Sequence, residues 1–367
     1  MTDWASVALN ERNLGDFLVE RGHIPRGRPV RAREMHGGVS NLAFWVEHGG
    51  GACVVKQARA RLAVRKEWLA DVRRIEREAE AMGWLYERLG PPRIPRMLFL
   101  ERECHAMGME AIAGPAANYK DLLLQGQVDP ALAEQFGALL ADMHNATADE
   151  ASRRRFGDTT FFDQLRLSPY YDTVAQRHPA VAGRIAALRA QCTGEGYCLV
   201  HGDYSPKNVL VREGGLVLLD YEVAHWGNPS FDLGFALTHY LCKAIHLPAH
   251  AEALLDAARR FWSVYRAGVT LPEASRAQAG HHLAAIMLAR VDGKSPLEYL
   301  VDEEQRNRVR TVALAALETD GTNIGAVIDR VTAAVAGSVD DSVNECLSDS
   351  MDDSVDDTAQ EPGQEEG

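Results

Sequence analysis

The chain has 367 residues, 46% of them apolar and 25% charged, and a formal net charge of −13 at pH 7. A single hydrophobic core stops growing below this length, so we expect two domains. The acidic excess comes from residues 338–367, which hold eleven acids and no Lys or Arg, and the nearly neutral remainder gives no electrostatic basis for a nucleic-acid or membrane partner.

The N-terminal residues and the cysteines indicate a cytoplasmic protein. Residues 1–13 lack the basic and apolar segments of a signal peptide, and no window holds the roughly 18 apolar residues that a membrane helix needs. The six cysteines show neither C-x-x-C spacing nor a regular framework, which is typical of reduced, mostly buried thiols. We therefore expect neither disulfides nor structural zinc.

A β-hairpin is expected near the beginning of the chain. An apolar run over residues 42–47 is bounded by Gly37-Gly38 on one side and by the glycines of residues 49–51 on the other. A second apolar run, Ala52-Cys53-Val54-Val55, ends at Lys56. Glycines between short apolar runs are typical of strands that tight turns connect.

A helix and a short strand complete this first lobe. A charge-dense helical pattern covers residues 64–89 and ends at Gly90-Pro91-Pro92, where glycine and proline stop a helix. The apolar stretch of residues 104–112 follows it. We expect the N-lobe to cover residues 1–110.

The second lobe is expected to be mainly helical. Asp129-Pro130 has the pattern of an N-cap followed by a first-turn proline, and apolar residues recur after it with helical spacing. Two short strands, residues 198–200 and 216–219, lie in the middle of the lobe, with residues 209–211 between them. Helical patterns then return up to Val331.

The end of the chain differs in composition. Residues 338–367 repeat SVDD and DDSV and are poor in large apolar side chains, so we predict a disordered acidic tail after a C-lobe of residues 111–337. Apolar residues four apart within the tail allow one alternative, a short helix that docks on a partner.

The stretch of residues 200–210, Val-His-Gly-Asp-Tyr-Ser-Pro-Lys-Asn-Val-Leu, carries the strongest chemical signal. Phosphoryl transfer from ATP needs one carboxylate near the acceptor hydroxyl, together with an amide oxygen and a second carboxylate that hold metal against the phosphates. Asp203 suits the first role, orienting the hydroxyl and accepting its proton. Asn208 and Asp220 suit the binding of Mg²⁺, which prefers oxygen ligands, and Glu222 is near enough in sequence to reach the same metal.

A competing interpretation of this loop is purely conformational. Gly, Asp, Asn, Ser and Pro are common in turns whether or not a site is present. Two carboxylates and an Asn at strand ends, together with a glycine-rich hairpin and a strand lysine, favour the catalytic interpretation.

The order of these parts resembles the aminoglycoside phosphotransferase and choline kinase family over about residues 35–240. The resemblance implies an α+β, two-lobed protein-kinase-like fold with a small antiparallel β-rich N-lobe and a larger, mainly helical C-lobe. Within the family, Val55-Lys56-Gln57-Ala58 and Asp220-Tyr221-Glu222 resemble the methylthioribose kinases. The implied reaction is transfer of the γ-phosphate of ATP, with Mg²⁺, to a hydroxyl group of a small acceptor.

The nucleotide-binding residues are implied by this resemblance. Lys56 corresponds to the lysine that pairs with the α- and β-phosphates, and Glu78 to its helix partner, although Glu76 and Glu80 lie on the same charged helix. Glu110 corresponds to the hinge, where its backbone meets the adenine. The loop before the hairpin supplies backbone amides and a hydroxyl to the phosphates through Gly38, Val39, Ser40 and Asn41.

Other residues of the second lobe also have counterparts in the family. Lys207 lies four residues after Asp203, whereas protein kinases place a lysine two residues after their aspartate, so it either reaches the γ-phosphate as a catalytic residue or stays in solvent. His201 is interpreted as a hydrogen-bonding residue rather than a base. Asp232 resembles the aspartate that braces the catalytic loop. Residues 161–172 mix aromatic and charged side chains and are a candidate wall of the acceptor pocket.

Two functional alternatives stay open beside the kinase. A pseudokinase or regulatory module would bind nucleotide and transfer nothing. A protein kinase is disfavoured because no D-F-G, A-P-E or activation segment follows Asp220. The acceptor is sugar-like, an amino alcohol or an aminoglycoside, and the sequence does not choose among these.

Overall fold

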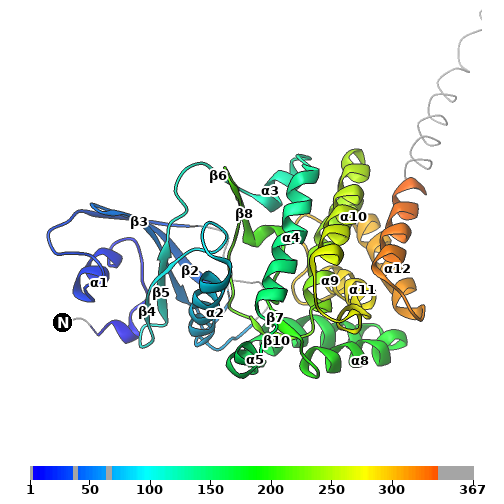
Figure 1. Ribbon diagram of the computed structural model, residues 1–367, viewed down its shortest axis with the longest axis horizontal. Helices are drawn as coiled ribbons and strands as arrows, with labels where there is room; N and C mark the ends of the chain where they lie inside the picture. The colour runs from blue at the N-terminus through cyan, green and yellow to red at the C-terminus, as the bar shows by residue number, and fades with distance from the viewer. Residues whose placement is uncertain (1–2, 36–39, 63–67, 338–367) are drawn as a thin grey trace, which may run out of the picture.

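An antiparallel five-stranded sheet forms the first lobe, with the strand order β1-β2-β3-β5-β4 (Figure 1). The computed structural model describes residues 3–35, 40–62 and 68–337, so the predicted acidic tail lies outside the described residues. The strands of the sheet are β1 (Val30–Glu34), β2 (Asn41–His48), β3 (Gly51–Ala58), β4 (Met97–Glu101) and β5 (Ala106–Glu110).

The predicted hairpin is confirmed as β2 and β3, and its register decides where Lys56 points. Side chains alternate between the two faces of a strand. Val55 packs in a cluster with α1 (Leu14–Glu20), whereas Val54 belongs to the core that continues into the second lobe. Lys56 therefore emerges on the same face as Val54, toward the second lobe.

The main helix of the first lobe is shorter than the sequence pattern predicts. Residues 64–89 were expected to be helical, but α2 covers Arg74–Leu89. Backbone hydrogen bonds from Leu62 to Trp68 and from Ala70 to Ala60 pair the preceding residues with each other, and the helix begins after them. The predicted stop is confirmed, because Gly90 has a φ of +67° and its N–H closes the last turn.

Helices make up most of the second lobe. Figure 1 shows α4, α9, α10, α11 and α12 stacked side by side, and α9 packs against both α10 and α11. Residues 324–337 are also helical. The helices are α3 (Tyr119–Leu124), α4 (Pro130–Ala146), α5 (Glu150–Phe156), α6 (Thr160–Phe162), α7 (Thr173–Arg177), α8 (Ala182–Thr193), α9 (Ser230–His246), α10 (Ala251–Gly268), α11 (Ala279–Asp292) and α12 (Glu303–Glu318).

Several shorter helical segments connect these elements. Asp163–Asp172 forms a π-helical segment, a rare geometry that is frequently found at functional sites. Single 3₁₀ turns occur at Trp4–Ser6, Pro179–Val181, Pro206–Asn208, Pro248–His250 and Glu273–Arg276.

Two small sheets position the loops of the second lobe. β7 (Cys198–Val200) pairs with β10 (His225–Gly227), and β8 (Val209–Arg212) lies between β6 (Ala116–Asn118) and β9 (Gly215–Leu218). The two strands expected in this region are confirmed within one residue as β7 and β9, and residues 209–211 between them lie in β8. The two-lobed α+β fold is confirmed as well.

A continuous apolar core joins the lobes. α2 packs against β3, β4 and β5 on one side and against α4 on the other, and Met82 and Leu85 belong to the same buried cluster as Phe136 and Leu140. Burying these side chains between the lobes fixes the sheet relative to the catalytic loop. Among the described residues, no helix combines the length and apolar character needed to cross a membrane.

Candidate active site

The loop after β7 is held by a buried aspartate. Asp232, in the first turn of α9, accepts hydrogen bonds from the backbone N–H groups of His201 (2.7 Å) and Gly202 (2.9 Å), and it contacts Nε2 of His144 at 3.2 Å. Gly202 has a φ of +75°, and Val223 lies 2.9 Å from the position of a Cβ, so the site needs glycine. Asp232 thus braces the backbone that leads into the catalytic loop.

His201 has a hydrogen-bonding role in this loop. Its Nδ1 accepts from the backbone N–H of Asp203 at 3.2 Å, which leaves Nε2–H to donate to the Leu219 carbonyl at 3.1 Å. Burial lowers the pKa of His201, so the imidazole is neutral in this arrangement. Both ring nitrogens are thereby used within the protein, which fits a structural rather than a basic role.

Asp203 presents two chemically different oxygens. Arg166 Nη2 (2.9 Å), Lys207 Nζ (2.9 Å) and Asn208 Nδ2 (2.8 Å) all contact Oδ2. Within the described residues, Oδ1 has no hydrogen-bond partner, and the residue lines a cavity. Burial alone would raise the pKa of Asp203, but the charges of Arg166 and Lys207 outweigh it and hold the pKa well below its usual range.

Lys56 pairs with one particular carboxylate of α2. Its Nζ lies 2.5 Å from Glu78 Oε1 and 3.4 Å from Asp220 Oδ1. Glu76 instead pairs with Arg102, and Glu80 lies 2.8 Å from Arg155. Burial opposes the charge on Lys56, but Glu78 and Asp220 outweigh it and raise the pKa of the lysine.

The backbone at Asp220 is strained. Its φ is +71°, in the left-handed region that residues other than glycine rarely adopt. Such conformations cost about 1–3 kcal/mol and persist where the surrounding structure fixes them, often at functional sites. Asp220 comes two residues after the end of β9, and the conformation brings its carboxylate to Lys56 in the other lobe.

Oxygen atoms suited to a cation gather beside this contact. Carboxylate oxygens of Glu78, Asp220 and Glu222 lie within 4.8 Å of one another. Glu78 Oε2 is buried and has no hydrogen-bond partner in the described residues. Asn208 uses its amide N–H groups on the backbone oxygen and Oδ2 of Asp203, so its amide oxygen is available as a ligand. A set of hard oxygen donors fits Mg²⁺.

Arg74 connects Glu222, a predicted metal ligand, to Ser40, which was predicted to bind the nucleotide. It is fully buried, and its Nε lies 3.1 Å from Glu222 Oε2. Its guanidinium also donates to the backbone oxygens of Ser40, Arg59 (2.8 Å) and Asp71 (3.0 Å). One side chain therefore ties the beginning of α2 to both the first and the second lobe.

A cavity of about 650 Å³ lies between the lobes. Ser40, Leu62 and Trp68 line it from the first lobe. The π-helical segment, α9 and α11 contribute a second wall, made by Leu165, Arg166, Tyr170, Phe235, His239 and Arg290. Residues 161–172 were a candidate wall of the acceptor pocket, and three of them face this cavity.

The structure brings most of the predicted site residues together. Lys56 contacts both Glu78 and Asp220, and Asn41 contacts Glu222. Glu110 ends β5, is exposed, and donates its N–H to the Arg96 carbonyl, so only its own carbonyl is left for an adenine. Gly38 and Val39 lie outside the described residues. The predicted residues that line the cavity are Ser40, Asp203, Lys207, Asn208, Asp220 and Glu222.

Sequence reasoning missed four residues of the site: Arg74, Arg166, His239 and Arg290. His239 and Arg290 are polar residues within helical apolar patterns, which look the same whether they serve packing or a ligand, and Arg74 is one of several charged residues at the beginning of α2. Arg166 fell within the segment proposed as an acceptor wall, so a signal for it existed.

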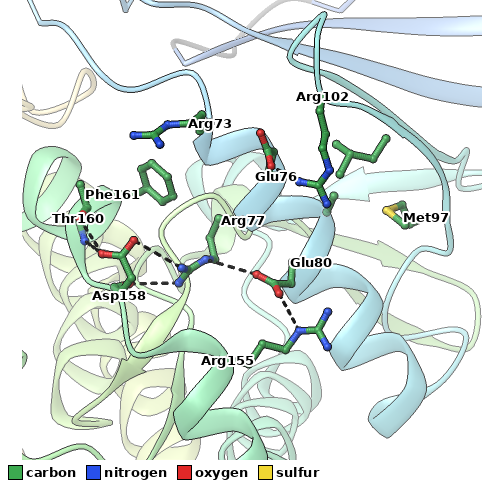
Figure 2. A pocket seen from close by; sticks show the side chains of 12 residues that line it. Arg73, Glu76, Arg77, Glu80, Met97, Arg102, Arg155, Asp158, Thr160 and Phe161 are labelled. Carbon is green, nitrogen blue, oxygen red and sulfur yellow. Dashed lines mark hydrogen bonds and ion pairs between the residues drawn. The ribbon is translucent and has the colours of Figure 1, made fainter.

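A second hollow, of about 440 Å³, lies on the outer side of α2 (Figure 2). Figure 2 shows Arg77 between Glu80 and Asp158, with Arg155 on the far side of Glu80. Its other arginines, Arg73 and Arg102, pair with acids as well. Because its charges neutralise one another and none of the catalytic-loop residues lines it, the cavity between the lobes is the better site.

The fold and this cleft are those of the two-lobed kinases, and comparison with known proteins gives the family. A model described as the phosphotransferase enzyme family matches residues 31–267. The match covers more than half of the chain, and the protein belongs to this family.

The individual relatives share low sequence identity with the chain. The chain is 23% identical over 253 residues to methylthioribose kinase 2 of Oryza sativa subsp. japonica, covering 61% of this chain and 59% of that protein. It is 25% identical over 277 residues to the methylthioribose kinase of Pectobacterium atrosepticum, covering 65% of this chain and 68% of that protein. The chain thus spans only about three fifths to two thirds of the length of these relatives.

A solved structure shows the same fold. An amicoumacin kinase in complex with AMP-PNP, Ca²⁺ and Ami superposes with a TM-score of 0.52 at 15% identity, covering 81% of this chain and 92% of that one.

Proposed function

We propose that this protein transfers the γ-phosphate of ATP to a hydroxyl group of a small molecule. The observation that carries the proposal is the arrangement of Asp203. Three donors converge on its Oδ2, while Oδ1 is left for a hydroxyl in a cavity that Asn208 and Asp220 also line. Membership of the phosphotransferase family supports the same reaction class.

In this proposal the nucleotide phosphates bind on the first-lobe side of the cavity. Lys56, held by Glu78, meets the phosphates as a point charge, and Ser40 lines the same side of the cavity. Asp220 and Asn208 would hold Mg²⁺, with Glu222 beside them, and the ion would supply positive charge to the phosphates.

The transfer step needs little covalent chemistry from the protein. The hydroxyl oxygen forms a bond to the γ-phosphorus while the bond to the bridging oxygen of ADP breaks, and the hydroxyl proton passes to Oδ1 of Asp203. A carboxylate with a lowered pKa is a weak base, so Asp203 acts mainly by orienting the hydroxyl. Such positioning suffices for a loose transition state, whose charge the nearby cations stabilise.

The acceptor is a small hydroxyl compound. The relatives named methylthioribose kinases favour a sugar-like acceptor over an amino alcohol or an aminoglycoside. The alternative function, a pseudokinase that binds nucleotide only, is disfavoured because Lys56, Asp203, Asn208 and Asp220 are all in place. The protein is proposed to act in the cytoplasm.

A metabolite screen tests this function. Purified protein is incubated with ATP, Mg²⁺ and a fractionated metabolite extract, and products are read by mass spectrometry. We expect one or more compounds to gain a phosphate in step with ADP formation, and the matched variant Asp203→Asn to form far less product. Absence of any phosphorylated product, with ATP still bound, would favour the pseudokinase.

A further inference from the structure

Two cations are buried in the second lobe without a carboxylate partner among the residues that the structure describes. Arg290, on α11, is 8% exposed, and Lys243, on α9, is fully buried. Lys243 Nζ donates to the His239 carbonyl at 3.3 Å and lies 5.0 Å from the centre of the Tyr299 ring. Neither contact supplies a negative charge.

Arg290 lines the cavity between the lobes and is only partly satisfied. Its Nη1 donates to the Tyr170 hydroxyl at 2.8 Å, and to the Ser295 backbone oxygen at 2.6 Å and Oγ at 3.1 Å. Its Nε is buried without a hydrogen-bond partner, and within the described residues Nη2 has none either. All the groups that hold Arg290 in place are therefore neutral.

Burying a charge without a counter-charge costs several kcal/mol. Lys243 can reduce this cost by losing its proton: burial, and then the positive charges of Lys120 and Arg290, lower its pKa to about 7. Arginine cannot reduce the cost by losing a proton, because its side chain stays protonated in proteins. Arg290 therefore keeps a positive charge at the cavity wall that no carboxylate of the described residues contacts, and an anion that binds in the cavity would pair with it.

The acid on the same wall makes no ion pair with Arg290 in the described residues, although its negative charge acts on both Arg290 and Lys243 from a distance. Glu298 is exposed and pairs with Lys120, and both line the cavity. His239 adds a further polar group to this wall. Burial, and then the charges of Lys243 and Arg290, lower the pKa of His239, so its imidazole is neutral and can donate one N–H.

Arg290 and the catalytic carboxylate of Asp203 line the same cavity. The ring of Tyr170 is contacted by two guanidinium groups, that of Arg290 at 5.7 Å and that of Arg166 at 5.9 Å from its centre. Arg166 in turn contacts Asp203 at 2.9 Å. One small molecule can therefore reach both Asp203 and Arg290.

We infer that the acceptor carries an oxyanion, a carboxylate or a phosphate ester, which binds Arg290 while its hydroxyl lies at Asp203. The inference rests on the proposed function and narrows its acceptor class to hydroxyl compounds that also carry an acidic group, which among sugar-like acceptors means sugar acids and sugar phosphates. Neutral sugars leave Arg290 unpaired, and cationic acceptors such as amino alcohols and aminoglycosides are repelled by it.

Matched acceptors that differ in charge test the inference. One series is glycerol, D-glycerate and sn-glycerol 3-phosphate, and a second is ethanolamine and L-serine. ADP formation is measured with each compound under ATP and Mg²⁺. A buried charge-assisted contact predicts that the members with a carboxylate or phosphate exceed the members without one by about 10- to 100-fold in kcat/KM. The carboxylate and phosphate arms identify which oxyanion the site prefers.

Three variants test whether Arg290 causes the preference for acceptors that carry an oxyanion. Arg290→Gln should abolish the discrimination, while Arg290→Lys keeps the charge and should retain part of it. Arg266→Gln removes the same charge from an exposed position on α10 and should leave the discrimination intact. Thermal melting reports whether Arg290→Gln folds, and Arg290→Lys and the wild-type series remain informative where it does not.

Binding is measured independently of transfer. Saturation-transfer NMR follows D-glycerate, and ³¹P line broadening follows inorganic phosphate, with protein saturated by AMP-PNP and Mg²⁺. Binding of either anion to wild type, weakened in Arg290→Gln, supports the inference even when no compound of the panel is phosphorylated. Equal or better turnover of the uncharged members, or no binding of either anion, overturns it while leaving the kinase proposal standing. Loss of AMP-PNP affinity in Arg290→Gln would instead assign Arg290 to the nucleotide. Failure of wild type to bind AMP-PNP at all would count against the proposed function itself.

Discussion

Replacement of the buried Arg74 is expected to lower the free energy of unfolding far more than replacement of its exposed neighbour Arg73, although both arginines pair with an acid. Arg74 is fully buried and pairs with Glu222, which is 4% exposed, while its guanidinium also binds the backbone oxygens of Ser40 and Arg59. Arg74→Met keeps a long apolar stem but leaves Glu222 buried without its counter-charge. Removing one partner of a buried ion pair costs about 3–5 kcal/mol.

The free energy of unfolding in urea measures this cost. The neighbouring residue supplies the control, because Arg73 is exposed and, among the residues that the structure describes, forms an ion pair with Asp71 alone. Arg73→Met should leave the free energy of unfolding unchanged within error, since exposed pairs are screened by water. A double variant that also carries Glu222→Gln should recover part of the loss, with a coupling of about 1–3 kcal/mol.

Two results would refute this reasoning. Equal stabilities of Arg74→Met and Arg73→Met would mean that the buried network contributes nothing. A double variant whose loss is the sum of the two single losses would mean that Glu222 does not depend on Arg74.

Two further predictions concern the buried lysines. Lys56→Ala should weaken ATP affinity by about 10-fold or more, because a charge-assisted phosphate contact is lost. Calorimetry measures this affinity, with Lys294→Ala, which replaces an exposed lysine, as the control. Equal ATP affinities of the two variants would mean that Lys56 does not bind the nucleotide. Burial lowers the pKa of Lys243 to about 7, below the ordinary value of 10.5, so the unfolded chain binds this proton more tightly. Wild type should therefore gain stability between about pH 7 and 10, whereas Lys243→Met should exceed it by on the order of 4 kcal/mol below pH 7 and lose that advantage as the pH rises. Urea unfolding at several pH values, with Lys294→Met as the control, checks this, and a pH-independent difference would contradict it.

Local patterns predicted the fold where the signals were short and bounded. The strand Cys198–Val200 was predicted at its observed limits, and α4 begins after the expected N-cap at Asp129. The beginning of α2 could not be predicted in this way, because residues 60–62 pair with residues 68–70, and a charge-rich pattern does not signal that pairing.

The same contrast holds within the site. Asp203 and Asn208 lie in one loop, so their spacing could be interpreted directly. Glu78 was left among three glutamates, although it lies three residues after Ile75 and four before Met82, on the apolar stripe of α2 that faces the core. That apolar pattern could have identified Glu78 as the partner of Lys56.

Arg290 could not have been recognised from the sequence. It lies near the end of an apolar helix, where a cation is expected from the helix dipole alone. Only the packing of α11 against the π-helical segment, more than a hundred residues earlier in the chain, brings it to Tyr170 and the cavity.

The different roles given to Asp203 and Asp220 form the central claim, and titration of ATP with and without Mg²⁺ into both variants tests it most directly. We predict that Asp203→Asn binds ATP with Mg²⁺ as wild type does but slows transfer to the identified acceptor by about 100-fold or more. Asp220→Asn should instead lose the Mg²⁺ dependence of ATP affinity, because one acidic ligand is removed. If both variants bind ATP with Mg²⁺ like wild type, and wild type phosphorylates no acceptor, the account is contradicted.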